Sequence, residues 1–143
     1  MTTTEITTIE PLTHHEAMRL QKDELECTLA SLRSIDDPAW SAATDCPAWD
    51  LRAMYQHVLG ACESGASMRE NIHQLRRARV YRKQQGGPLE AALSAVQVSE
   101  RRDLSPVQIV ERLAAIAPKT ASQIKMTLGW NRSGGMFFRG RRF

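Results

Sequence analysis

The chain has 143 residues, of which 42% are hydrophobic, 24% charged and 6% aromatic, and this composition is typical of one soluble globular domain. No apolar run approaches the ~20 residues that span a bilayer, and the Thr-rich start lacks the basic and apolar segments of a signal peptide. We therefore predict neither membrane insertion nor secretion. The cysteines Cys27, Cys46 and Cys62 are odd in number and lack C-x-x-C spacing, which favours a reducing cytoplasm over a disulfide framework.

The positive charge of the chain is concentrated at its end. Of the net charge of +3, four arginines among the last twelve residues supply +4, which leaves −1 on residues 1–131. A second basic run, residues 76–83, would end a helix, where positive charge complements the helix dipole. We interpret this run as a solvated helix end and do not expect a nucleic-acid partner, because no recognition motif accompanies it.

The apolar spacing predicts helices throughout the chain. The first helix is expected over residues 13–35, because Thr13 and Glu16 have the spacing of a capping box. Pro38 ends it, and a loop follows to about residue 48. The loop holds Trp40 and Trp49, whose rings we expect to cover one end of a helical bundle rather than to bind a ligand.

Asp50 is a good N-cap for the next helix, which we expect to run without interruption into the basic residues 76–83. Its apolar residues step by three and four and form one predicted buried seam. This seam consists of Met54, Val58, Ala61, Gly65, Met68, Ile72 and Leu75. His57 projects about 60° to one side of Met54, so we place it at the edge of the buried stripe.

Two further helices are expected, over about residues 88–102 and from Ser105 onward. Pro118 should kink or stop the latter, with weak helical character as far as residue 125. Residues 1–12 read as a flexible N-terminus, 13–125 as one helical domain and 126–143 as an irregular basic tail.

The sequence contains no G-x-S-x-G, P-loop, G-x-G-x-x-G or H-E-x-x-H motif. Among four histidines, only His57 is placed to face an interior. A single histidine beside an apolar stripe is more often a hydrogen-bonded core residue than a metal ligand. Cys46 is too far along the helix axis to share a metal with His57 easily, so structural burial is the expectation for Cys46 and for Cys62.

Residues 45–60, DCPAWDLRAMYQHVLG, carry a recognisable pattern. They resemble the hallmark stretch of the mycothiol-dependent maleylpyruvate isomerase N-terminal family, within the DinB-like superfamily. The cysteine, proline, tryptophan, basic residue, histidine and glycine of that stretch occur here in order. The layout of the neighbouring helices agrees as well, so the resemblance covers about residues 12–120.

The resemblance implies an all-α, DinB-like helical bundle with a divalent metal, usually zinc, at one end of its core. His57 would be the first metal ligand. In the family, two more ligands come from the last bundle helix, four residues apart and therefore on one helical face. The resemblance also implies mycothiol as a thiol cofactor, bound to the metal as thiolate, in an isomerase or transferase reaction.

The chain departs from this pattern after Ala121, where it has no histidine and no acidic residue. One histidine cannot hold zinc, because zinc sites take three or four protein ligands. We therefore expect a bundle that lacks the regular fourth helix, impaired activity, and a truncated or frame-shifted ending. The alternative is a non-catalytic helical module that forms a homodimer, or holds another partner, through the uncovered apolar seam.

Overall fold

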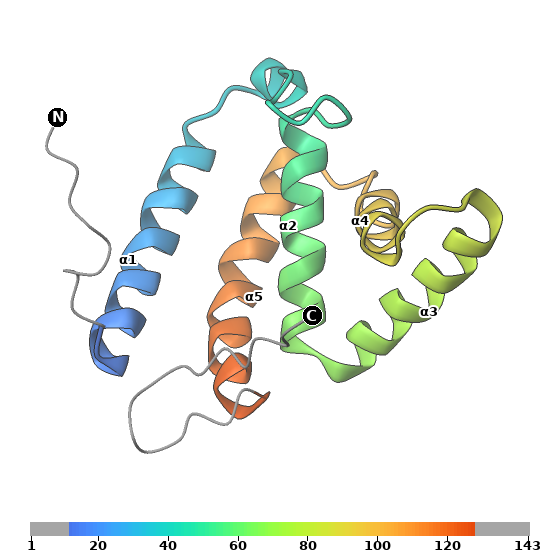
Figure 1. The fold of residues 1–143 in the computed structure, drawn as a ribbon. Coiled ribbons are helices and arrows are strands. Elements are labelled where there is room, and N and C mark those ends of the chain that lie inside the picture. Colours follow the sequence, from blue (N-terminus) through green and yellow to red (C-terminus); the bar gives the residue numbers. More distant parts are fainter. Residues whose placement is uncertain (1–11, 128–143) are drawn as a thin grey trace, which may run out of the picture.

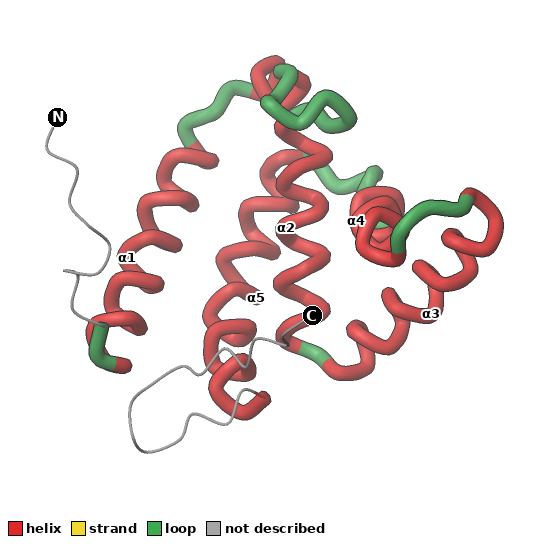
Figure 2. Tube along the Cα trace, in the orientation of Figure 1, coloured by secondary structure: helices red, strands yellow, loops and turns green. Residues whose placement is uncertain are grey.

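The computed structural model describes residues 12–127 (Figure 1). These residues form α-helices joined by short connections and contain no β-strand (Figure 2), which confirms the all-α prediction. In chain order the α-helices are α1 (His14–Arg33), α2 (Leu51–Ala66), α3 (Met68–Gln85), α4 (Leu89–Ser99) and α5 (Pro106–Thr127), and the 3₁₀ helix η2 (Asp37–Ser41) lies between α1 and α2. No helix in this part of the chain is long and apolar enough to cross a membrane.

Helix α2 is the centre of the fold. It packs most extensively against α5, which also contacts α1, so that α1, α5 and α2 lie side by side (Figure 1). The main core lies among these three helices and η2, and includes Leu29, Leu59, Ile109 and the buried ring of Trp40. A smaller core of Ala78, Ala92 and Val96 joins α3 to α4, and both of these helices pack against the other side of α2.

The predicted helix starts are confirmed where the signal is local. At the start of α1, the Thr13 amide donates to Glu16 Oε2 at 2.8 Å and the Thr13 hydroxyl accepts from the Glu16 amide at 3.3 Å, which completes a capping box. Ser105 and Gln108 exchange the equivalent two bonds at the start of α5. Asp50 caps α2 by accepting from the Ala53 amide at 2.8 Å.

The prediction of one uninterrupted helix from Asp50 to the basic run is wrong. The helix breaks at Ser67, which has an extended backbone and accepts from the Glu70 amide at 3.3 Å. Ser67 thus serves as the N-cap of a separate helix, α3, with the S-x-x-E spacing that favours a helix start. The break turns the chain, so that α3 leaves the end of α2 at an angle (Figure 1).

The predicted apolar seam is also wrong. Met68 is 72% exposed, Ile72 43% and Val58 36%, whereas Leu59, outside the predicted seam, is fully buried. Because the helix breaks at Ser67, the residues before and after the break do not share one face. The true core stripe of α2 is centred on Leu59 and faces α5.

Helix α5 continues through Pro118 to Thr127, so Pro118 does not stop it, and the helix passes residue 125, the limit predicted for weak helical character. Proline removes a single amide donor, and the Thr120 hydroxyl ties this part of α5 to α2 by donating to the Cys62 carbonyl at 2.6 Å. The predicted flexible start, residues 1–12, and the predicted irregular basic tail fall almost wholly outside the described residues.

A buried polar network fixes α4 and α3 on α2. The Arg101 side chain is only 6% exposed, and its guanidinium pairs with Glu63 of α2 and Glu70 of α3. Gln97 donates to Gln74 Oε1 at 2.8 Å, and Gln74 donates in turn to the Gly60 carbonyl at 2.9 Å. The close approach of α4 to α2 depends on Gly60, where an added Cβ would lie 2.7 Å from the Cβ of Gln97.

Replacement of Arg101 by methionine should lower the free energy of unfolding by about 3 kcal/mol, because it leaves Glu63 and Glu70 without their cation in a largely buried site. The measurement is urea unfolding followed by circular dichroism. Arg102→Met is the matched control: Arg102 is exposed, and its loss should change stability by less than about 0.5 kcal/mol. Equal effects of the two substitutions would contradict the role given to Arg101.

Candidate functional site

The candidate site begins in the loop that precedes α2. Thr44 closes this loop: its hydroxyl donates to the Trp49 carbonyl at 2.8 Å and accepts from the Cys46 amide at 3.1 Å. Ala43 and Asp50 form an isolated antiparallel bridge across the same loop. These bonds hold Trp49 directly before the first turn of α2. The role of Thr44 was not anticipated, although a threonine two residues before Cys46 is typical of a side-chain turn.

His57 lies in the second turn of α2 under the ring of Trp49. The two ring centroids are 5.1 Å apart and the planes are tilted by 35°. His57 is half-buried, and its Nδ1 is buried without a hydrogen-bond partner among the described residues. Because His57 is two residues before Leu59, it lies about 160° around the helix from the stripe that faces α5.

Three other residues of the stretch 45–60 make contacts that stabilise the fold. Arg52 donates from Nε to the Leu104 carbonyl at 3.2 Å, and so anchors the connection between α4 and α5. Gln56 donates to the Arg101 carbonyl at 3.0 Å. Gly60 lets Gln97 approach α2. Much of the pattern therefore serves to assemble α2 with α4 and α5.

The cysteines are free thiols. Burial raises the pKa of the Cys62 thiol and the neighbouring Glu63 raises it further, while a hydrogen bond with Thr120 acts in the opposite direction. At neutral pH Cys62 is therefore a protonated thiol rather than a thiolate ligand. Cys46 is half-buried within the closed loop, in line with the structural role expected for both residues.

The donor set does not fit the metal that the resemblance implies. Within residues 12–127 there is no group of three or more His, Cys, Asp or Glu side chains that could hold a metal ion. The sequence beyond Ala121 adds no such residue. His57 is one accessible imidazole beside a tryptophan, whereas zinc sites need at least three protein ligands.

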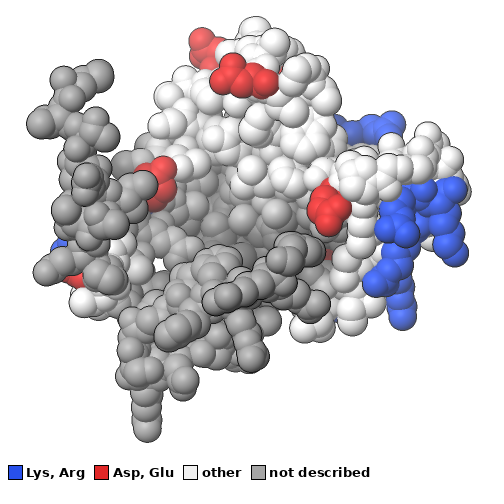
Figure 3. Space-filling model, in the orientation of Figure 1, with Lys and Arg blue, Asp and Glu red and all other residues white. Residues whose placement is uncertain are grey.

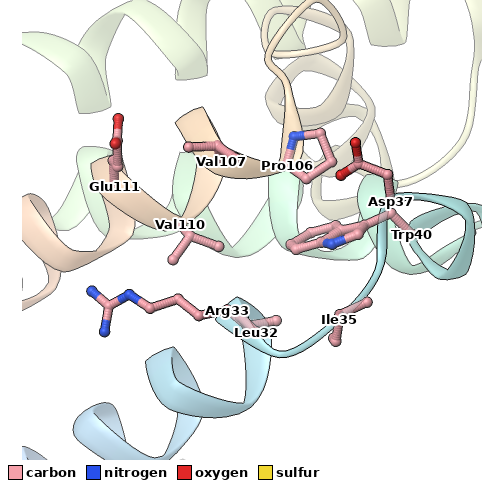
Figure 4. Close-up of a pocket in the computed structure, with 9 residues that line it drawn as sticks. All are labelled: Leu32, Arg33, Ile35, Asp37, Trp40, Pro106, Val107, Val110 and Glu111. Atoms are coloured by element: carbon pink, nitrogen blue, oxygen red, sulfur yellow. The ribbon is translucent and has the colours of Figure 1, made fainter.

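A cavity of about 200 Å³ lies elsewhere, where α1, η2 and the start of α5 meet (Figure 4). Six apolar side chains and three charged ones line it: Leu32, Ile35, Trp40, Pro106, Val107, Val110, Arg33, Asp37 and Glu111. Neither His57 nor any cysteine is among them. The structure thus separates the candidate metal ligand from this cavity, and sequence analysis did not anticipate the cavity, because its walls come from three distant segments.

Fold and site together define a helical-bundle domain in which a half-buried histidine, His57, lies beside the ring of Trp49 near the start of α2. The model of the mycothiol maleylpyruvate isomerase N-terminal domain family matches residues 22–130. The chain belongs to this family, which is part of the DinB-like superfamily. No curated protein and no solved structure matches the chain in the other two comparisons.

Proposed function

We propose that this chain is a family member whose mycothiol-dependent isomerase or transferase activity is impaired, because it cannot complete the metal site. The proposal is supported by the donor set: within the described residues, His57 does not belong to a group of three or more His, Cys, Asp or Glu side chains that could hold a metal ion. The family name links these domains to mycothiol. A thiol cofactor needs a metal or a cationic pocket to be held as thiolate, and the described residues offer no group of three or more His, Cys, Asp or Glu side chains to hold that metal. In this proposal the stretch of residues 45–60 stabilises the fold.

The test is the zinc content of the purified full chain, measured by elemental analysis for the wild type, His57→Ala and His73→Ala. We expect far less than one zinc per chain in all three, because one imidazole binds zinc weakly. His73 is the control, since it is exposed and contacts Glu100 at 3.0 Å. About one zinc per chain in the wild type and in His73→Ala, but not in His57→Ala, would overturn the proposal and indicate ligands from a second copy.

The second candidate function is that of a homodimerisation module. The observation that favours it is the exposure of Met68 and Ile72, two large apolar side chains one helical turn apart on α3. A second copy packed over these residues would remove apolar surface that the described part of one chain leaves in water. The proposal needs no metal and no thiol cofactor.

Molar mass from light scattering tests this candidate. We expect about twice the 16.1 kDa of one chain for the wild type, and a shift toward the single-chain mass for Met68→Lys, because a charge would be placed in the interface. Val107→Lys is the matched control, since Val107 is a 62% exposed apolar residue on a different helix, α5. A wild type that is monomeric, or two variants with the same mass as the wild type, would contradict dimerisation through this surface.

A further inference from the structure

The outer side of α3 carries a stripe of unpaired cations. Arg69, Arg76, Arg79 and Lys83 follow one another at steps of seven, three and four residues, so they lie within about 80° of each other around the helix. All four are exposed. From Arg69 to Lys83 the stripe rises about 21 Å along the helix axis. Figure 3 shows Lys and Arg side chains gathered over α3 at one side of the molecule.

These cations lack the partners that a structural role would give them. Within the described residues, Arg77 pairs with Glu100, whereas none of the four stripe residues takes part in an ion pair. The sole acidic residue of α3, Glu70, is turned to the buried Arg101. The four stripe residues therefore present positive charge to solvent that no acidic side chain of the described residues neutralises in an ion pair.

The helix dipole does not explain the stripe. A cation stabilises a helix end only within the last turn, which in α3 contains Arg82 and Lys83. Arg69 lies in the first turn, where positive charge is unfavourable, and Arg76 lies in the middle of the helix. The sequence-based interpretation placed residues 76–83 at a solvated helix end. Helix α3 continues to Gln85, so Arg76 and Arg79 lie before its last turn and the helix dipole does not account for them.

We propose that this face of α3 binds the phosphate backbone of double-stranded nucleic acid without reading its sequence. A duplex presents one negative charge per about 1.7 Å of its axis, so a straight row of cations meets several phosphates at once. The exposed Ile72 and Val80 lie among the cations on the same face. Two apolar side chains make too narrow a strip to bury in a lipid surface, which makes an anionic membrane the less favoured partner.

The test measures binding of the full chain to a short fluorescent DNA duplex by anisotropy at about 50 mM and about 200 mM salt. The wild type should bind with a steep salt dependence. Arg76→Gln/Arg79→Gln should bind roughly tenfold more weakly at the lower salt, and its slope of log K against log salt should be shallower by about 1.8, or about 0.9 for each lost contact. Arg76→Lys/Arg79→Lys should keep most of the affinity, because the charges remain.

Two control variants distinguish binding through α3 from binding through positive charge elsewhere in the chain. Arg19→Gln/Arg33→Gln removes two exposed cations from α1 and should leave the slope nearly unchanged. Arg139→Gln/Arg141→Gln/Arg142→Gln removes the C-terminal arginines and should leave the dependence on α3 intact. The proposal is overturned if the wild type does not bind the duplex, or if either control weakens binding as much as the α3 variant. Binding to phosphatidylserine vesicles but not to DNA would overturn it in favour of a membrane.

Discussion

The architecture depends on one buried cation. Arg101 lies beyond the end of α4, yet its guanidinium reaches Glu63 on α2 and Glu70 on α3. A charge removed from water is tolerated only when its partners and hydrogen bonds are in place, so the three helices must meet in one arrangement for Arg101 to be buried. The glutamines beside it extend the same constraint by linking Gln97, Gln74 and the Gly60 carbonyl. This polar layer holds the α3–α4 pair against α2, while apolar packing holds α1 and α5 on its other side.

These contacts explain several residues of the stretch 45–60 in structural terms. Arg52, Gln56 and Gly60 all contact the segment around α4 and its connection to α5. Their contacts join α2 to this segment and involve no metal. His57 differs from them, because its Nδ1 has no partner among the described residues and its ring is covered by Trp49. The stretch therefore holds residues that assemble the bundle, together with one half-buried histidine beside Trp49.

Sequence reasoning succeeded where the signal is local. The capping boxes at Thr13 and Ser105 were predictable because each joins residues three apart. The break at Ser67 was missed because apolar spacing was followed across a serine with its own capping partner, Glu70. The polar layer was not predictable at all, since Arg101 and Glu63 are 38 positions apart and nothing in either local sequence indicates burial. The family was recognised from the residues around His57, whereas the absent ligand set was evident from the composition after Ala121.

We infer that His57 lies beside Trp49 without serving as a metal ligand. The ¹⁵N chemical shifts of the His57 ring nitrogens, recorded on the full chain before and after addition of one equivalent of zinc, test this inference. We expect that neither shift moves and that the spectrum of the neighbouring Trp49 indole is unchanged. A shift of one ring nitrogen to the position of a metal-bound imidazole, with saturation at one zinc per chain, would contradict it.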